Sequence, residues 1–200
     1  MQTLGLGGES KRSDGWLKSL LWPSVENAWD VDYLGQQGMW ICTGVAIFTV
    51  LFSLIIGNVI MIAVSILYAL FYLLGGMGVR QANLSAAILV FASFLLGELV
   101  QMATGHLPGV IGILITGVLL SNVRGTFLAS QWKPLAEGED RPTRFNETLA
   151  DQYIDQMPAK LWPVLQIPFI ILAITLFLFT LLGMVLAVKG QGLFLSLIHI

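Results

Sequence analysis

Long apolar stretches alternate with short polar segments over most of this chain. The apolar stretches cover residues 39–76, 84–104, 108–127 and 163–188. A single helix over the first stretch would extend ~57 Å, nearly twice the ~30 Å hydrocarbon core of a bilayer. It must therefore fold back into two spans, near 39–56 and 59–76. The pattern predicts an all-α, multi-pass bundle of about five transmembrane helices.

Glycine, asparagine and proline mark the expected connections between these spans. Gly57-Asn58 supplies turn chemistry at the middle of the longest run. Residues 75–83 are expected to form a polar, glycine-rich loop, with Asn83 capping the third span. Residues 105–108 predict the next turn, and Pro163 is expected to open the fifth span.

Two amphipathic elements are expected at the membrane surface, on the side of the N-terminus. In segment 1–37, a helix capped by Asp14 is followed by a second piece that stops at Gly35, and its tryptophans favour the interface. Another amphipathic helix is expected over 145–161, ended by Pro158. Its acidic face is predicted to face water and its apolar face to pack on the spans. This polar, mainly acidic face is formed by Arg144, Glu147, Asp151 and Asp155.

The pattern of apolar and polar residues divides the chain into consecutive segments, some inside the expected membrane and some at its surface. They are the interfacial segment 1–37, the four-span region 38–128, the amphipathic segment 129–162, the fifth span 163–189 and the tail 190–200. Residues 195–200 resemble the translated end of a transposase adapter used in sequencing libraries. They are therefore left out of the fold prediction, and the natural chain is expected to have been cut near Phe194.

The composition supports lipid as the solvent for much of the chain. Of 200 residues, 56% are hydrophobic and 11% are charged, whereas soluble domains carry roughly 25% charged residues. The net charge of −2, without a basic block, argues against nucleic acid as a partner. Cys42 stands in an apolar run as a small buried hydrophobe. No metal or cofactor motif is present, so no cofactor is expected.

The basic residues predict which side of the membrane the N-terminus occupies. With five spans, all but one of the 10 Lys and Arg residues share the side of the N-terminus, and Lys189 alone lies opposite. Basic residues beside spans stay in the cytoplasm. Arg80, Arg124 and Lys160 are thus interpreted as topology anchors, with a cytoplasmic N-terminus and a bacterial inner membrane as the expected location.

One acidic residue stands inside an expected span and is the main candidate for chemistry. A carboxylate at a helix centre costs roughly 2.5–3.5 kcal/mol on insertion scales, which makes Glu98 a functional hypothesis. With Gln101 and Ser93 it forms a candidate intramembrane polar seam, and the small residues Ser93 and Gly97 would let another helix come close. The alternative is structural: Glu98 hydrogen-bonds between helices or reaches the outer interface, since it lies about 21 Å from Leu84.

The sequence is compatible with three functions. The first is a non-enzymatic scaffold, assembly factor or complex subunit, which contacts other membrane subunits or itself through small-residue helix faces. The second is a transporter or channel component that uses Glu98 and Gln101. The third is the membrane anchor of an enzyme whose soluble domain followed residue 194. The lack of catalytic motifs favours the first.

The orientation can be tested by labelling single cysteines in intact cells, in a Cys42→Ala background. A cysteine at position 106 is expected to react with a membrane-impermeant maleimide, because its turn lies on the outer side. A cysteine at position 139 is expected to react only after the cells are opened. The opposite labelling pattern would reverse the predicted orientation.

Overall fold

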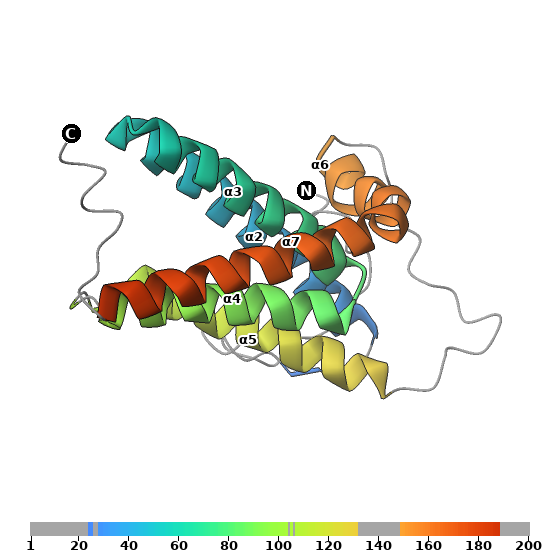
Figure 1. Cartoon of the computed structure of the whole chain (residues 1–200). Helices are drawn as coiled ribbons and strands as arrows, with labels where there is room; N and C mark the ends of the chain where they lie inside the picture. Colours follow the sequence, from blue (N-terminus) through green and yellow to red (C-terminus); the bar gives the residue numbers. More distant parts are fainter. Residues whose placement is uncertain (1–23, 26–27, 104, 106, 132–148, 189–200) are drawn as a thin grey trace.

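The computed structural model describes residues 24–25, 28–103, 105, 107–131 and 149–188. The described part is helical, without strands (Figure 1). Its helices are α2 (Ala28–Ile56), α3 (Val59–Arg80), α4 (Leu84–Ala103), α5 (Val110–Ser130), α6 (Leu149–Asp151), the π-helical turn η1 (Gln152–Gln156) and α7 (Met157–Val188). Three expected parts of the chain lie outside the described residues: the amphipathic pieces before residue 24, the loop 132–148 and the tail from 189.

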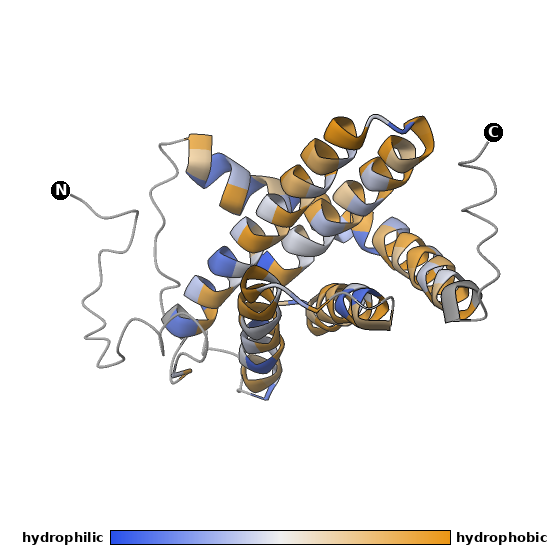
Figure 2. Cartoon of the chain, turned by 90° about the vertical axis from the view of Figure 1, so that its left-hand side faces the viewer, coloured by the Kyte–Doolittle hydropathy of each residue, from blue (hydrophilic) through white to orange (hydrophobic). Residues whose placement is uncertain are grey.

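Within the described residues, five helices are long and apolar enough to cross a membrane, which confirms the predicted all-α fold with about five helices of membrane-spanning length. The candidate spans are Asp30–Ile56, Val59–Arg80, Leu84–Ala103, Val110–Ser130 and Leu149–Val185. Hydrophobic residues dominate the long helices in Figure 2. Successive helices run in opposite directions, so α3 and α5 end, and α7 begins, on the side of the bundle where α2 starts. We call this the N-terminal side and the opposite one the outer side.

The two asparagine turns form as the sequence predicts. Gly57 has a φ of 74°, a left-handed conformation that glycine adopts without steric cost. The Asn58 side chain accepts hydrogen bonds from the backbone N–H groups of Ile60, at 2.9 Å, and Met61, at 3.1 Å. Asn83 caps α4 in the same way by accepting from the N–H of Ala86 at 2.9 Å. Both caps satisfy donors that have no partner inside the helix.

Glycines that were expected to end helices lie inside them instead. Helix α2 continues through Gly35, and α3 continues through Gly75, Gly76 and Gly78 to Arg80. The predicted stop at Gly35 is therefore wrong, and of the predicted loop over 75–83 only residues 81–83 lie outside the helices. Membrane helices tolerate glycine because lipid offers the backbone no alternative hydrogen-bond partner. A glycine there serves packing rather than termination.

The glycines of α3 let three other helices come very close to it. A Cβ atom built on Gly75 would lie 2.3 Å from Cγ2 of Val90, and one on Gly76 would lie 2.8 Å from Cβ of Cys42. On Gly78 it would lie 2.4 Å from Cβ of Ala86 and 2.5 Å from Cη2 of Trp162. These neighbours belong to α2, α4 and α7. The segment Gly75–Gly78 is therefore the point on which the bundle converges.

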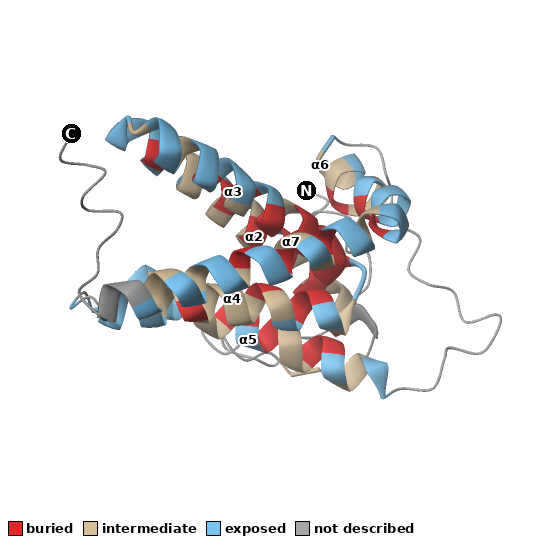
Figure 3. Cartoon of the chain, in the orientation of Figure 1, coloured by how far each residue is buried: buried red, intermediate tan, exposed pale blue. Residues whose placement is uncertain are grey.

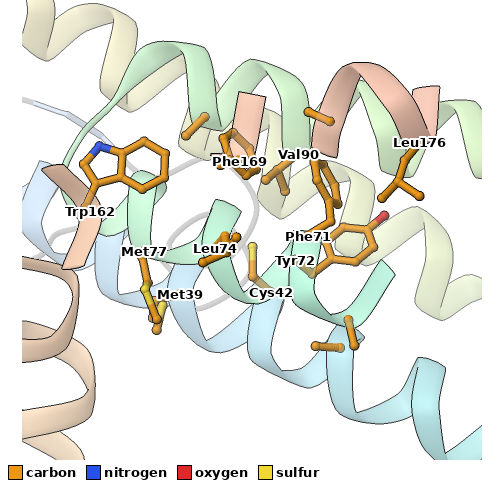
Figure 4. Close-up of a cluster of buried hydrophobic side chains, with 14 of the residues drawn as sticks. Met39, Cys42, Phe71, Tyr72, Leu74, Met77, Val90, Trp162, Phe169 and Leu176 are labelled. Atoms are coloured by element: carbon orange, nitrogen blue, oxygen red, sulfur yellow. The ribbon is translucent and has the colours of Figure 1, made fainter. Parts of the chain in front are cut away.

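An aromatic cluster fills the core beside these glycines (Figure 4). Phe71 stacks on Phe169 with ring centroids 5.3 Å apart and meets the ring of Tyr72 edge-on at 5.1 Å. Trp162 packs on the other side of Phe169 at 5.5 Å. Because Phe71 and Phe169 are fully buried, these contacts join α3 to α7 independently of any polar group. Figure 3 shows buried residues gathered where these helices cross.

Helix α7 begins earlier than its prolines indicated. It starts at Met157 and contains Pro163 and Pro168 in its interior, so the predictions that Pro158 ends a helix and Pro163 begins one are wrong. The N–H of Met157 bonds to the carbonyl of Gln152, which carries the chain from η1 into α7. Pro158 follows in the first turn of α7 and has no N–H to add to the hydrogen bonds that continue from η1.

The outer part of the α2–α3 hairpin, residues 47–67, leans away from α4, α5 and α7 (Figure 1 and Figure 2). Most of its large apolar side chains are exposed on both helices, as Figure 3 also shows. Inside it, the hydroxyls of Ser53 and Ser65 are buried and hydrogen-bonded to each other at 2.7 Å. Over this length the two helices mainly pack on each other. We call residues 47–67 the outer hairpin.

Two glycine substitutions test whether the convergence at α3 determines stability. Gly78→Ala is expected to destabilise the protein by ~1–3 kcal/mol, because the new methyl group overlaps Ala86 and Trp162. Gly97→Ala, in α4, is the control: its Cβ would meet no atom within 4 Å, and alanine favours a helix by up to ~1 kcal/mol. Unfolding of the detergent-solubilised protein, followed by tryptophan fluorescence, measures both. Equal effects of the two substitutions would contradict the packing argument.

Candidate functional site

The guanidinium of Arg80, at the end of α3, is a buried polar group with several hydrogen bonds. Its side chain is only 4% exposed and lies between two carboxylates. Nη1 donates to Oδ1 of Asp32 at 2.9 Å and to the Asp32 carbonyl at 3.3 Å. Nη2 and Nε both donate to Oδ1 of Asp155, at 2.6 Å and 3.1 Å. One cation thus joins α2, α3 and η1.

Local packing explains how a guanidinium fits here. A Cβ on Gly35 would lie 3.4 Å from Nη1 of Arg80 and from the carbonyl oxygen of Val79, so Gly35 brings the backbone of α2 directly against the end of α3. Asp32 lies one helical turn before Gly35 and faces the same way. Both acids are charge partners of one buried cation, so removing Arg80 takes this partner from both, and breaking a buried ion pair in this way costs about 3–5 kcal/mol.

A second contact holds the chain around Asp155 against α2. The hydroxyls of Tyr153 and Thr43 lie 2.7 Å apart and are hydrogen-bonded, and the Tyr153 ring lies 6.0 Å from that of Trp40. Ile154 is buried between these contacts. We call residues 149–156 the docking segment. Of the apolar face expected to pack on the spans, Ile154 is buried, whereas Leu149, Met157 and Leu161 are exposed. Asp155, expected to face water, turns inward to Arg80.

The three predicted topology anchors lie on the N-terminal side of the bundle. Arg80 and Arg124 are near the ends of α3 and α5, and Lys160 is in the first turn of α7. Their environments differ: Arg80 is buried, Arg124 is half-buried and Lys160 is exposed. Their common side agrees with the arrangement from which the orientation was predicted. The role of all three as anchors stays a prediction.

Glu98, the acid expected inside the membrane, packs against a glycine of the next helix. A Cβ on Gly112 of α5 would lie 2.6 Å from Oε1 and 2.9 Å from Oε2 of Glu98. Oε2 is inaccessible to solvent, and no hydrogen-bond partner for it is found within the described part of the chain. Tyr72 of α3 is near enough to interact with it electrostatically. Glu98 therefore lies between α4 and α5.

The rest of the predicted seam has a different environment from Glu98. Gln101 is exposed and Ser93 is half-buried, and helix geometry turns Ser93 about 140° away from Glu98. A Cβ on Gly97 would be in open space, so the expected close helix contact at Ser93 and Gly97 is wrong at Gly97. Of the three seam residues, Glu98 has the contacts of a buried site. A joint role of all three stays a prediction.

Helix α5 carries another buried polar group, on the N-terminal side. Asn122 is 2% exposed, and its Nδ2 donates to the Val118 carbonyl at 3.0 Å. Its Oδ1 lies 2.6 Å from where a Cβ of Gly38 would be, so Asn122 packs directly on α2. The structure thus buries this amide between α5 and α2.

The sequence singled out Arg80 but did not predict which side chains bind it, nor the contact between Tyr153 and Thr43. Asp32 is 48 residues from Arg80, Asp155 is 75 residues away, and Tyr153 is 110 residues from Thr43. Such pairs leave no periodic signal in a single sequence. A weak indication existed for Asp32, because an acid placed before a long apolar run requires a partner or water.

Comparison with known protein families, with characterised proteins and with solved structures gives no match. Among the described residues, no group of three or more His, Cys, Asp or Glu side chains could hold a metal ion.

Proposed function

We propose that this protein is a non-enzymatic membrane scaffold or complex subunit that binds other membrane-embedded chains through its outer hairpin. The observation that carries the proposal is the separation of this hairpin from the other helices. Phe48, Phe52 and Ile55 on α2 are 75%, 67% and 81% exposed, and Val59 on α3 is 80% exposed. A hairpin set apart in this way offers helix surface on both of its sides.

The internal construction of the outer hairpin supports this role. The buried bond between Ser53 and Ser65 keeps α2 and α3 paired where the other helices do not reach, and interhelical hydrogen bonds hold membrane helices together. The hairpin therefore keeps its shape without the bundle. In a bilayer, association between helices depends on such shape and packing, because lipid tails cover apolar surface equally well.

The proposed orientation follows from the basic residues. We infer a cytoplasmic N-terminal side and a bacterial inner membrane, supported by the common side of Arg80, Arg124 and Lys160 and by the rule that basic residues beside spans stay inside. The outer hairpin then approaches the outer leaflet. Its partners would accordingly be membrane-spanning chains or a second copy of this protein.

Site-specific photocrosslinking in native membranes tests the scaffold proposal. A photoreactive phenylalanine analogue replaces Phe48 or Phe52 in the outer hairpin, and Val164 or Ile171 in α7 as controls of similar exposure, 74% and 61%. We expect one discrete protein adduct, identified by mass spectrometry, from the hairpin positions and mainly lipid adducts from α7. The same adducts from both sets, or lipid adducts alone from both, would contradict the proposal.

A second candidate function is transport that depends on Glu98. It is favoured by one observation: a carboxylate oxygen inside a candidate span is inaccessible to solvent and has no hydrogen-bond partner in the described part of the chain. Intramembrane acids with this environment commonly bind protons, ions or substrate groups. Gly112 leaves the space that the carboxylate occupies.

The substitution Glu98→Gln separates the two functions, because it removes the charge and nearly preserves the shape. If the scaffold proposal holds, Glu98→Gln leaves both the unfolding temperature and the crosslinks of the outer hairpin unchanged. If Glu98 serves transport, a proton or cation flux into proteoliposomes is lost while the unfolding temperature is preserved. The control is Gln101→Asn, at an exposed position of the same helix, which is expected to change neither.

A further inference from the structure

We propose that the docking segment, residues 149–156, is a hinged element that opens from the α2–α3 pair, and that the contact between Asp155 and Arg80 holds it closed. The inference is independent of the proposed scaffold function. It rests on how the segment is attached, on the geometry of its junction with α7, and on the charge that remains when it leaves.

The side chains seen to attach the docking segment to the bundle lie near its C-terminal end. Asp155 bonds to Arg80 of α3, Tyr153 bonds to Thr43 of α2, and Ile154 is buried between them. At the other end of the segment, Leu149 is 84% exposed. Among the contacts that the described residues show, the segment is thus held near its C-terminal end by a charged contact, a neutral hydrogen bond, the buried side chain of Ile154 and the packing of Tyr153 against the hydrophobic core.

The junction with α7 has the features of a hinge. Residues 152–156 form a π-helical turn, and the N–H of Met157 reaches back five residues to the carbonyl of Gln152. Pro158, the next residue, has no N–H to add to this ladder. Turns of this kind and prolines are where helices change direction, and Figure 1 shows the chain turning between α6–η1 and α7. The segment can therefore rotate without disturbing the core of α7.

The arrangement of charges makes opening less costly than breaking an ordinary buried ion pair. Arg80 contacts two carboxylates, and the one on α2, Asp32, stays in place when the segment leaves. The guanidinium that remains is still paired, while Asp155 moves into water. The large penalty for an uncompensated buried charge is thereby avoided. The α2–α3 contact itself persists through Gly76, which packs on Cys42 and Met39.

Distances between spin labels test the proposal on the full chain in nanodiscs, with Cys42→Ala removing the native thiol. Labels at positions 81 and 152 report the docking segment, and labels at 81 and 131 report the bundle; all three positions are exposed. The variants compared are Asp155→Asn, Asp32→Asn and Asp155→Glu. The two asparagine variants are a matched pair, because each removes one carboxylate from the same guanidinium.

Asp155→Asn is expected to raise the ratio of open to closed segments by roughly tenfold or more, seen as a longer 81–152 distance. Asp32→Asn and Asp155→Glu are expected to keep the short distance, and the 81–131 distance is expected to stay constant throughout. Adding Tyr153→Phe to Asp155→Asn is expected to open the segment further. The proposal is overturned if Asp155→Asn leaves the 81–152 distance unchanged, if both asparagine variants lengthen it equally, or if the 81–131 distance also changes.

Discussion

The rest of this structure depends on how closely other helices approach α3 at its glycines. Val90 of α4, Cys42 of α2 and Trp162 of α7 occupy the space that side chains at Gly75, Gly76 and Gly78 would need. In a bilayer, where lipid covers apolar surface as well as protein does, such van der Waals contact is the main gain from bringing helices together. The convergence also fixes the end of α3, and with it the place where Arg80 must find partners.

Arg80 turns this packing into a defined arrangement at the N-terminal side. Its planar guanidinium donates in fixed directions, so it binds two carboxylates only if α2 and η1 are positioned correctly. Buried ionic groups add little net stability compared with apolar packing of similar volume. We therefore attribute stability to the aromatic and glycine contacts around Phe71, and attribute the position of the docking segment to Arg80. Neither the aromatic and glycine contacts nor Arg80 connects the outer hairpin to the rest of the bundle, which is consistent with its separation.

The sequence predicted the spans and their asparagine turns well, because these depend on local composition and on single caps such as Asn58 and Asn83. It failed where residues that end helices in water lie inside a membrane helix. Gly35, Gly76 and Pro163 were expected to mark ends, yet the helices continue, since a backbone without water must keep its internal hydrogen bonds. Glu98 was recognised from its cost in lipid, but Gly112 beside it, and Asp32 and Asp155 beside Arg80, are contacts that no periodicity reveals.

One packing rule connects the polar groups at both ends of the bundle. Arg80 lies against Gly35, Asn122 against Gly38 and Glu98 against Gly112, with each polar atom close to where the Cβ atom of that glycine would be. A polar side chain that rests on a neighbouring backbone is removed from lipid without needing a cavity, and the neighbouring helix loses no side-chain contact because it has no side chain there. Glycine in this chain therefore has two uses: it brings apolar helices together at Gly75–Gly78, and it receives polar groups at Gly35, Gly38 and Gly112. The second use removes polar atoms of Arg80, Asn122 and Glu98 from the surface of the bundle.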